Sequence, residues 1–139
     1  MDVFEMIKFH EGFRATPYRD TRGVLTIGYG QRVDELSISE KLALQMLQVK
    51  VCNLEVKLAH IDWFGGLDSV RQDVIIDMAY QLGIDGVLGF HEMIAHIEYQ
   101  DWSLAANAML DSDWAKQTPA RAKQLAAMMR TGEWPEEPK

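Results

Sequence analysis

One short strand-like run in a chain of otherwise helical periodicity limits the fold most. Residues 24–27, Val-Leu-Thr-Ile, are rich in β-branched side chains, and the turn-forming run Asp-Thr-Arg-Gly at 20–23 lies just before them. Gly28 and Gly30 follow. The segment from Thr16 to Val33 therefore predicts a β-hairpin or the start of a small antiparallel sheet. Because strands are confined to this region, the pattern predicts a mainly helical α+β fold.

Capping signals and apolar spacing predict helices on both sides of this segment. Asp2 and Glu5 form a capping-box pattern for a first helix that ends by Gly12. Ser37 and Glu40 repeat the pattern ahead of a helix that continues to about residue 60. Further helices are predicted from Ser69 to Gly83, over residues 90–98 and 102–110, and from Pro119, after the N-cap Thr118, to Arg130.

Length and charge narrow the class of protein. A chain of 139 residues predicts a single domain. Its 14 Lys and Arg against 21 Asp and Glu give a net charge of −7, the wrong sign for a protein that binds nucleic acid through phosphates. No apolar run approaches the roughly 18 residues of a membrane-spanning helix. Charges are scattered through the first eight residues, so no signal peptide is expected.

Neither disulfide nor metal chemistry is indicated. Cys52 is the one cysteine, and its apolar-periodic surroundings predict a buried structural thiol. His91 and His96 are five residues apart and do not share a helix face, while His10 and His60 are isolated. We therefore expect no metal site and no cofactor. Of the aromatic residues, Trp102, Trp114 and Trp134 are expected to pack within the helical part of the fold.

A pair of carboxylates offers a possible chemistry. Cleaving a glycosidic bond takes one carboxyl group to protonate the leaving oxygen and a second to activate water or attack carbon. Glu11 falls at the expected end of the first helix, Asp20 at the hairpin turn, and the hydroxyl of Thr26 on the returning strand. The alternative is a helix-end glutamate and an aspartate that merely favours a turn, and spacing alone leaves both open.

The whole stretch from Glu11 to Gly30 follows the pattern E-G-x-R-x-x-x-Y-x-D-T-x-G-x-x-T-I-G-x-G. It closely resembles the catalytic segment of the phage-type lysozymes, the endolysin family that includes the T-even phage enzymes. Two later blocks are similar to the family's central helix and C-terminal signature. They are Leu67 to Arg71 with Gln81-Leu82-Gly83 and Gly86 to Phe90, and then Trp114, Gln117 to Ala122 and Arg130 to Trp134. The segment between Gln31 and Gly66 is shorter than in the T-even members.

This resemblance implies roles for four residues. Glu11 would be the general acid, Asp20 the second carboxylate, and Thr26 a hydroxyl that holds the attacking water. Arg121, within the matching T-P-x-R-A motif, would pair with Glu11 and orient it. A nearby cation favours ionised glutamate, whereas a general acid must keep its proton. Our hypothesis is that Arg121 mainly fixes the side chain, and that bound substrate desolvates Glu11 and so favours its protonated form.

Substrate contacts transfer less directly. The resemblance implies Gly30, Arg32, Tyr80, Gln81 and Met93 as substrate-binding positions. Tyr80 stands where the family has an aromatic residue, while Arg32 and Met93 stand where it has Leu and Ser. After Gly30 the family's His is replaced by Gln31, so the ion pair made there is absent.

The implied architecture is a lysozyme-like, two-lobed α+β fold within one domain. A sheet lobe covers about residues 13–38 and a connecting helix about 39–60. The helical lobe covers 61–139 and includes the N-terminal helix, residues 2–11. The implied reaction is hydrolysis of the β-1,4 bond between N-acetylmuramic acid and N-acetylglucosamine in peptidoglycan, with inversion. Inversion predicts carboxyl groups about 6.5–9.5 Å apart.

The implied setting is lysis of a bacterial host. The protein would be a monomer that stays in the host cytoplasm until a separate membrane-permeabilising protein, a holin, releases it to the periplasm and cell wall. Three alternatives remain open. They are an inactive peptidoglycan-binding or phage structural module with the same fold, an acidic helical interaction domain, and an enzyme that acts on chitin.

Overall fold

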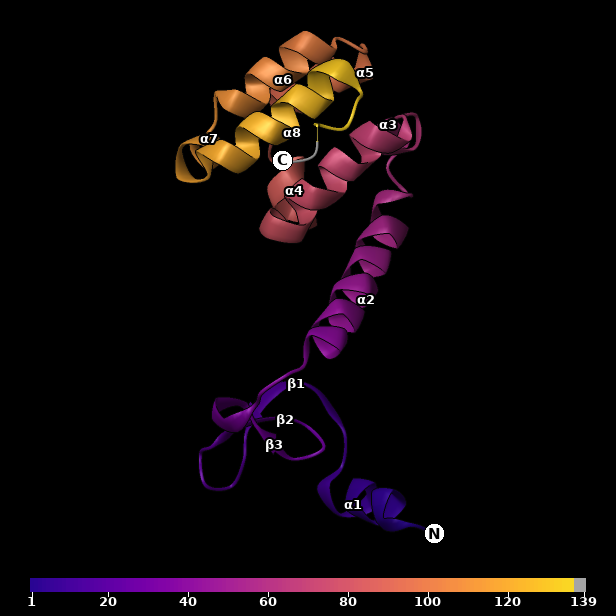
Figure 1. The fold of residues 1–139 in the computed structure, drawn as a ribbon, viewed down its shortest axis with the longest axis vertical. Coiled ribbons are helices and arrows are strands. Elements are labelled where there is room, and N and C mark those ends of the chain that lie inside the picture. The colour runs from indigo at the N-terminus through magenta and orange to yellow at the C-terminus, as the bar shows by residue number, and fades with distance from the viewer. Residues whose placement is uncertain (137–139) are drawn as a thin grey trace. The chain divides into compact units, whose positions relative to one another are not determined.

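The computed structural model describes residues 1–136, which form eight α-helices, one 3-10 helix and a three-stranded sheet. Figure 1 shows their order along the chain. The chain forms two compact units, Met1–Leu44 and the part from Gln45 onward, and the boundary falls within helix α2, Glu40–Leu58. The prediction that residues 1–139 form one domain with lobes at the stated boundaries stays a prediction.

The N-terminal unit consists of a capped helix and a small sheet. The Asp2 side chain accepts from the Glu5 N–H of α1, Val3–Glu11, and the Glu5 side chain accepts from the Asp2 N–H, which confirms the predicted capping box. The strands pair antiparallel in the order β1-β2-β3, as expected from the turn signals. The strands are β1 Arg14–Arg19, β2 Leu25–Gly28 and β3 Gln31–Arg32, and a 3-10 helix, η1 Val33–Glu35, follows them.

Helix α2 matches the long helix predicted over about residues 39–60, but two details differ. Ser39 caps it, its hydroxyl accepting from the Leu42 N–H, so the Ser37 pattern placed the cap two residues early. Cys52 is exposed, so the prediction of a buried thiol was wrong. The apolar residues around it do not form a single stripe, and the helix buries only Leu54 and Leu58.

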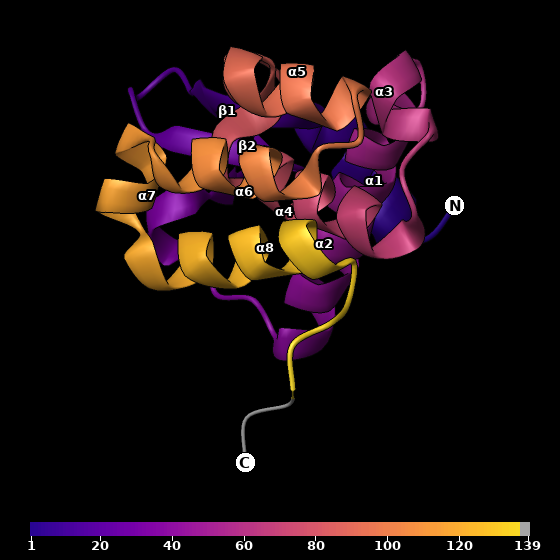
Figure 2. The same ribbon diagram turned by 90° about the horizontal axis from the view of Figure 1, so that it is seen from above.

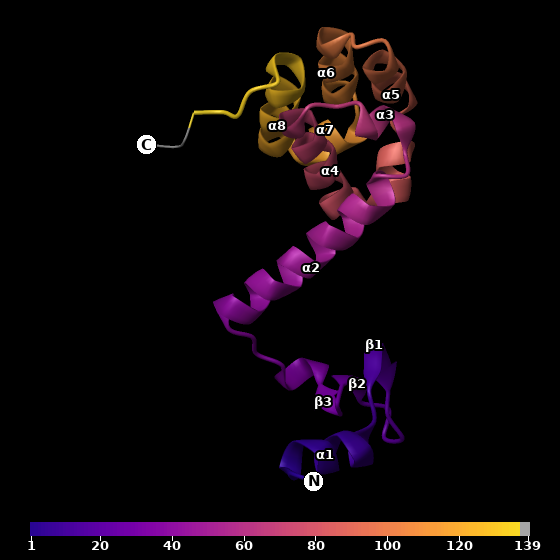
Figure 3. The ribbon, with the colours of Figure 1, turned by 90° about the vertical axis from the view of Figure 1, so that its right-hand side faces the viewer.

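The C-terminal unit is built from packed helices. In Figure 2, α6 lies between α5 and α8, and it contacts both. Figure 3 shows α3 close to α5 at one end of this group, again with contacts between them. The helices are α3 Asp62–Gly65, α4 Ser69–Leu88, α5 His91–Glu98, α6 Trp102–Leu110, α7 Asp113–Gln117 and α8 Pro119–Thr131.

Helix α4 contains the stop predicted at Gly83. Gly83 has φ 78° and ψ 166°, outside the helical region, and helical turns resume beyond it as far as Leu88. The capping residue is Asp68, whose carboxylate accepts from the Arg71 N–H, rather than the predicted Ser69. The predicted helix break at Gly83 is thus confirmed. The helical turns between Gly83 and Leu88 were not predicted, since so short a segment shows no helical period.

The hydrophobic core lies in this unit. Its largest fully buried side chains include Leu58, Ile75 and Met109. Trp114 is buried and Trp102 is half-buried, as expected, but Trp134 is 63% exposed, so its predicted place in the helical packing was wrong. Trp134 comes after Gly132 has ended α8 with a left-handed φ of 71°. Among residues 1–136, no helix is both long and apolar enough to cross a membrane.

Candidate active site

The predicted general acid lies against a glycine of the sheet. Glu11 is the last residue of α1, and Gly12, with φ 71°, ends the helix there. A Cβ added to Gly30 would lie 2.7 Å from the Glu11 Cδ and closer still to its Oε2. Only a glycine at position 30 therefore lets the Glu11 carboxylate occupy this place. Gly30 was predicted as a substrate-binding residue, and in this unit it is a neighbour of the acid.

Aromatic contacts connect the end of α1 to the turn between β2 and β3. The rings of Phe13 and Tyr29 are tilted toward one another with centroids 5.6 Å apart. The Lys8 ammonium lies 5.7 Å from the Tyr29 ring centroid. Lys8 lies in the last turn of α1 and Phe13 follows the helix, so both contacts bring the end of the helix to the residue just before Gly30. They explain why Glu11 and Gly30 meet although 19 positions separate them in sequence.

Asp20 is held by the turn that it forms. Its Oδ1 accepts from the backbone N–H groups of Arg22, at 2.8 Å, and Val24, at 2.9 Å. The bond from the Val24 N–H does most to lower the pKa of the Asp20 carboxyl; slight desolvation opposes it, and the Arg22 N–H and the positive charges of Arg22 and Arg32 add to it. Asp20 is therefore kept ionised, the state that the second carboxylate of a glycosidase needs.

Thr26 shares a backbone partner with Asp20. The Val24 carbonyl accepts from the Asp20 N–H and from the Thr26 hydroxyl, both at 2.9 Å. Thr26 is 4% exposed and pairs in register with Tyr18 of β1 and Arg32 of β3. The backbone N–H of Asp20 and the hydroxyl of Thr26 thus bond to one carbonyl, while the Asp20 carboxylate accepts from the N–H groups of Arg22 and Val24. Sequence reasoning did not single out Val24, since a role carried by the main chain leaves no trace in the side-chain type.

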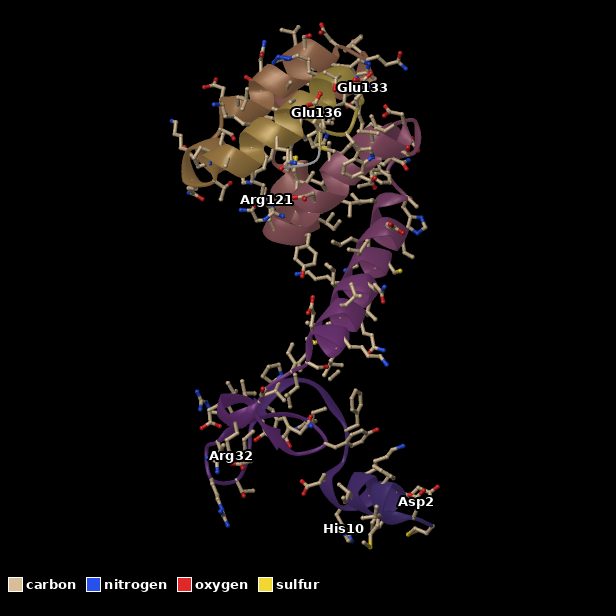
Figure 4. The ribbon with its side chains drawn as sticks, in the orientation of Figure 1. Asp2, His10, Arg32, Arg121, Glu133 and Glu136 are labelled. Atoms are coloured by element: carbon tan, nitrogen blue, oxygen red, sulfur yellow. The ribbon has the colours of Figure 1, made fainter. Side chains whose placement is uncertain are left out.

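Arg32, labelled in Figure 4, lies opposite Thr26 in the sheet and carries a positive charge there. Its guanidinium is 3.7 Å from the Asp34 carboxylate and 3.6 Å from that of Glu35. These side chains are about half to two-thirds exposed, so the pairs add little stability. The predicted role of Arg32 in substrate binding stays a prediction, as does that of Gly30.

Arg121 belongs to the C-terminal unit, where it is also labelled in Figure 4. Its Nε and Nη2 both lie 2.7 Å from Oδ1 of Asp77 on α4, and Nη2 also donates to the Asp77 carbonyl at 3.2 Å. Sequence reasoning missed Asp77, since the two residues are 44 positions apart and no motif links them. The expectation that Arg121 pairs with Glu11 concerns residues of different units and stays a prediction.

The remaining substrate-binding predictions also fall in the C-terminal unit. Tyr80 is 36% exposed, and the Lys50 ammonium lies 4.3 Å from its ring centroid. The side-chain amide oxygen of Gln81, Oε1, accepts from the indole N–H of Trp114 at 2.8 Å. Met93 is 1% exposed, although it lines a cavity of about 380 Å³ that Trp114 also lines. Met93 thus lines this cavity, and Gln81 bonds to Trp114, which also lines it. The roles of Gln81 and Met93 in substrate binding stay predictions.

Metal chemistry finds no obvious place in this arrangement. Within residues 1–136, no group of three or more His, Cys, Asp or Glu side chains could hold a metal ion. The polar groups gathered in the N-terminal unit are a carboxylate beside a glycine, an ionised carboxylate in a turn, and a hydroxyl. Such groups can donate a proton, accept one, and bind water. Fold and site together define a mainly helical α+β protein with one carboxylate at the end of α1, one in the turn between β1 and β2, and a hydroxyl on β2.

Comparison with known protein families identifies that class. The family model described as phage lysozyme matches residues 8–131, and the chain therefore belongs to the phage lysozyme family. The match confirms the resemblance inferred from the sequence motifs and the lysozyme-like α+β fold. It makes the chain a glycoside hydrolase of the lysozyme family.

Three relatives illustrate the breadth of the match. "Probable T4-type lysozyme 1" of Dictyostelium discoideum is 29% identical, over 94% of this chain and 94% of the relative. "Probable T4-type lysozyme 2" of the same organism is 26% identical, over 92% and 93%. The "Pre-baseplate central spike protein Gp5" of Enterobacteria phage T4 is 28% identical over 95% of this chain, which matches only 28% of that protein. Proteins with similar sequences thus occur both as whole lysozymes and as part of a larger phage protein.

Proposed function

We propose that this protein is a muramidase that hydrolyses the β-1,4 bond between N-acetylmuramic acid and N-acetylglucosamine in bacterial peptidoglycan. The observation that carries the proposal is the turn around Asp20. The Arg22 and Val24 N–H groups donate to the Asp20 carboxylate, and the Asp20 N–H and the Thr26 hydroxyl both donate to the Val24 carbonyl. The close approach of Glu11 to Gly30 supports it from the same unit.

Each residue has a distinct part in the proposed reaction. Glu11 donates a proton to the leaving oxygen of the glycosidic bond. Asp20 accepts a proton from a water molecule, which Thr26 holds with its hydroxyl, and that water attacks the anomeric carbon. The product configuration is then inverted, and the two carboxyl groups should lie about 6.5–9.5 Å apart when substrate is bound.

Arg121 is the proposed positioning residue for Glu11. Its guanidinium already holds one carboxylate, that of Asp77, so it has the chemistry for a second. If Arg121 orients Glu11, Arg121→Ala lowers the rate and moves the acidic limb of the pH–rate profile. An unchanged limb together with an unchanged rate would remove Arg121 from the mechanism.

The biological setting is part of the proposal as well. A muramidase of this kind acts on the cell wall of a bacterial host and causes lysis, after a holin releases it from the cytoplasm. We propose that it works as a monomer, since one chain carries every residue assigned above.

A second candidate function is a phage structural module with the same fold. The similarity to the central spike protein favours it, because that protein carries a matching segment within a longer chain. The retained Glu11, Asp20 and Thr26 favour the enzyme, since a purely structural module has no need of this set.

One experiment separates these functions. Purified peptidoglycan is digested with the wild-type protein and with Glu11→Gln, and the new reducing ends are identified. We expect saccharides ending in N-acetylmuramic acid from the wild type and none from the variant. No release by a folded wild type would favour the structural module. Release by both proteins would mean that Glu11 is not the acid, and release from chitin alone would reassign the substrate.

A further inference from the structure

A second cavity of the C-terminal unit, of about 550 Å³, is not used by the proposed reaction. It lies where α3 meets the end of α5 and the start of α6, and Figures 1 and 3 both show α3 beside α5. Trp63 and Trp102, both half-buried, line it, above the buried side chains of Leu67 and Ile97. Its volume is within the range of about 300–1,000 Å³ typical of small-molecule sites.

The polar groups of this cavity select against anions. Asp62 and Glu98 are exposed carboxylates on its lining, and no Lys or Arg is among the residues that line it in the described structure. Gln100 adds an amide, which both donates and accepts. The two indole N–H groups can only donate. An ammonium group can only donate hydrogen bonds, so it could not pair with the indole N–H groups or with the amide N–H of Gln100.

Gln100 has a left-handed backbone conformation, which residues other than glycine rarely adopt. Its φ is 57°, the one positive φ at a non-glycine residue within 1–136. Its N–H donates to the Ile97 carbonyl at 2.9 Å, and the next N–H, that of Asp101, donates to the His96 carbonyl at 2.9 Å, so this residue ends α5. Glycine or asparagine is the usual residue at such a helix end. A glutamine therefore costs more backbone strain here than a glycine would, while its amide lines the cavity.

Trp102 is held in position from one side. The Arg71 guanidinium carbon lies 4.0 Å from the Trp102 ring centroid, and Arg71 is itself 9% exposed. Arg71 is anchored in turn, since it donates to the Met129 and Arg130 carbonyls at 2.6 and 3.2 Å. The indole therefore offers a preorganised apolar surface, which lowers the entropic cost of binding.

We propose that this cavity is a second glycan-binding site that takes an uncharged, N-acetylated hexosamine unit. The apolar face of a pyranose ring packs on the indoles, while its hydroxyl and acetamido groups bond to Asp62, Glu98 and Gln100. The sugar class rests on the proposed function, in which the substrate is a glycan of N-acetylated hexosamines. The site would hold a strand of the cell wall independently of the residues that cleave it.

The test uses the full chain carrying Glu11→Gln, so that the probe is not cleaved. The tetramer of N-acetylglucosamine is titrated in, and the indole N–H signals of Trp63 and Trp102 and the Gln100 amide are followed by NMR. We expect saturable shifts in all three. Adding Gln100→Gly relieves the backbone and keeps the fold, with an unchanged or higher Tm, but weakens binding at the indoles about three- to tenfold. Tyr99→Ala, at an 87% exposed neighbour outside the cavity lining, is the matched control and should leave binding unchanged.

Three results would overturn the proposal. They are the absence of saturable shifts at the two indoles, undiminished binding by the Gln100→Gly protein, or the same shifts when N-acetyl-lysine amide replaces the sugar. Peptidoglycan digestion by the wild type separates this failure from that of the proposed function. Digestion without shifts at the indoles removes only the second site, whereas shifts without digestion remove only the muramidase.

Discussion

The two units of this protein differ in the interactions that stabilise each of them internally. The structure describes every residue of Met1–Leu44, and the one side chain buried among them is polar, that of Thr26. Between residues 45 and 136, 21 apolar side chains are buried in one cluster. The first unit relies on hydrogen bonds within turns and on glycines with positive φ, at positions 12, 23, 28 and 30. Taken by itself, this unit positions its polar groups through hydrogen bonds and buries little apolar surface.

The proposed proton transfers belong to the first unit, while the second unit contains the apolar core and the proposed positioning residue Arg121. The proposed acid, carboxylate and hydroxyl all lie in the first unit, whereas the second contains the apolar core. Substitutions in the first unit should therefore change activity more than stability, and core substitutions in the second should do the reverse.

Truncating one leucine in each unit to alanine should show the largest difference in the free energy of unfolding. Leu58 is fully buried, so Leu58→Ala should lower the free energy of unfolding by about 2–5 kcal/mol through lost transfer energy and a residual cavity. Leu25 on β2 is 38% exposed, and Leu25→Ala should cost under about 1 kcal/mol. Denaturant unfolding of both variants measures this. Equal losses would mean that the first unit also depends on apolar burial.

Gly30→Ala should reduce activity through Glu11. The added Cβ would displace the Glu11 carboxylate, and a misplacement of about 1 Å can lower a rate about a hundredfold. Gly23→Ala is the matched control, because Gly23 has a similar φ of 78° but no atom within 4 Å of an added Cβ. Rates of reducing-end release, compared with the Tm of each variant, test this. Equal loss of activity in both would assign the effect to backbone strain.

Arg71→Met should destabilise the second unit by about 1–3 kcal/mol, since it leaves the buried Met129 carbonyl without its donor. Asp68, which also bonds to Arg71, can be rehydrated because its side chain is 42% exposed. Lys116→Met serves as the control, since Lys116 and Asp113 form an exposed pair at 4.0 Å, and it should change stability by under about 0.5 kcal/mol. Thermal unfolding checks both, and a loss of similar size in the control would remove the special role of Arg71.

The pKa values of two aspartates should be shifted in opposite directions from the ordinary value. The Val24 N–H lowers the pKa of Asp20, whereas burial raises the pKa of Asp73 on α4. The bonds of Asp20 therefore stabilise the turn above its unfolded pKa of about 3.9, and this contribution is lost as pH falls through its folded pKa. For Asp73 the ionised form is disfavoured in the folded state, so its contribution to stability improves as pH falls.

Carboxyl-carbon NMR titration would measure both groups. We expect the midpoint of Asp20 below 3.8 and that of Asp73 above 3.8, the ordinary value for an aspartate. A midpoint for Asp20 at or above that value would show that the turn does not hold the ionised carboxylate.

Local signals in the sequence predicted most of the elements but few of their contacts. The capping box at Asp2, the break at Gly83 and the helices over 90–98 and 102–110 were predicted because each depends on neighbouring residues. The short helices α3 and α7 were missed, since four or five residues are too few to show a helical period.

In the candidate site, too, local signals predicted individual residues but not the contacts between them. The motif was enough to propose Glu11, Asp20 and Thr26, but not the Val24 carbonyl that two of them share. The pairing of Arg121 with Asp77 joins two helices far apart in sequence, and no local pattern reports such a contact. The exposure of Cys52 was predicted wrongly because apolar spacing was taken as burial on a helix that buries only two residues.

The most direct test measures activity and stability on the same preparations of Glu11→Gln and Leu58→Ala. The account predicts that Glu11→Gln releases no saccharides ending in N-acetylmuramic acid while its Tm stays at the wild-type value. It also predicts that Leu58→Ala unfolds at a lower temperature but keeps its rate per folded molecule below that transition. Release of such saccharides by Glu11→Gln at a rate near that of the wild type would contradict the account.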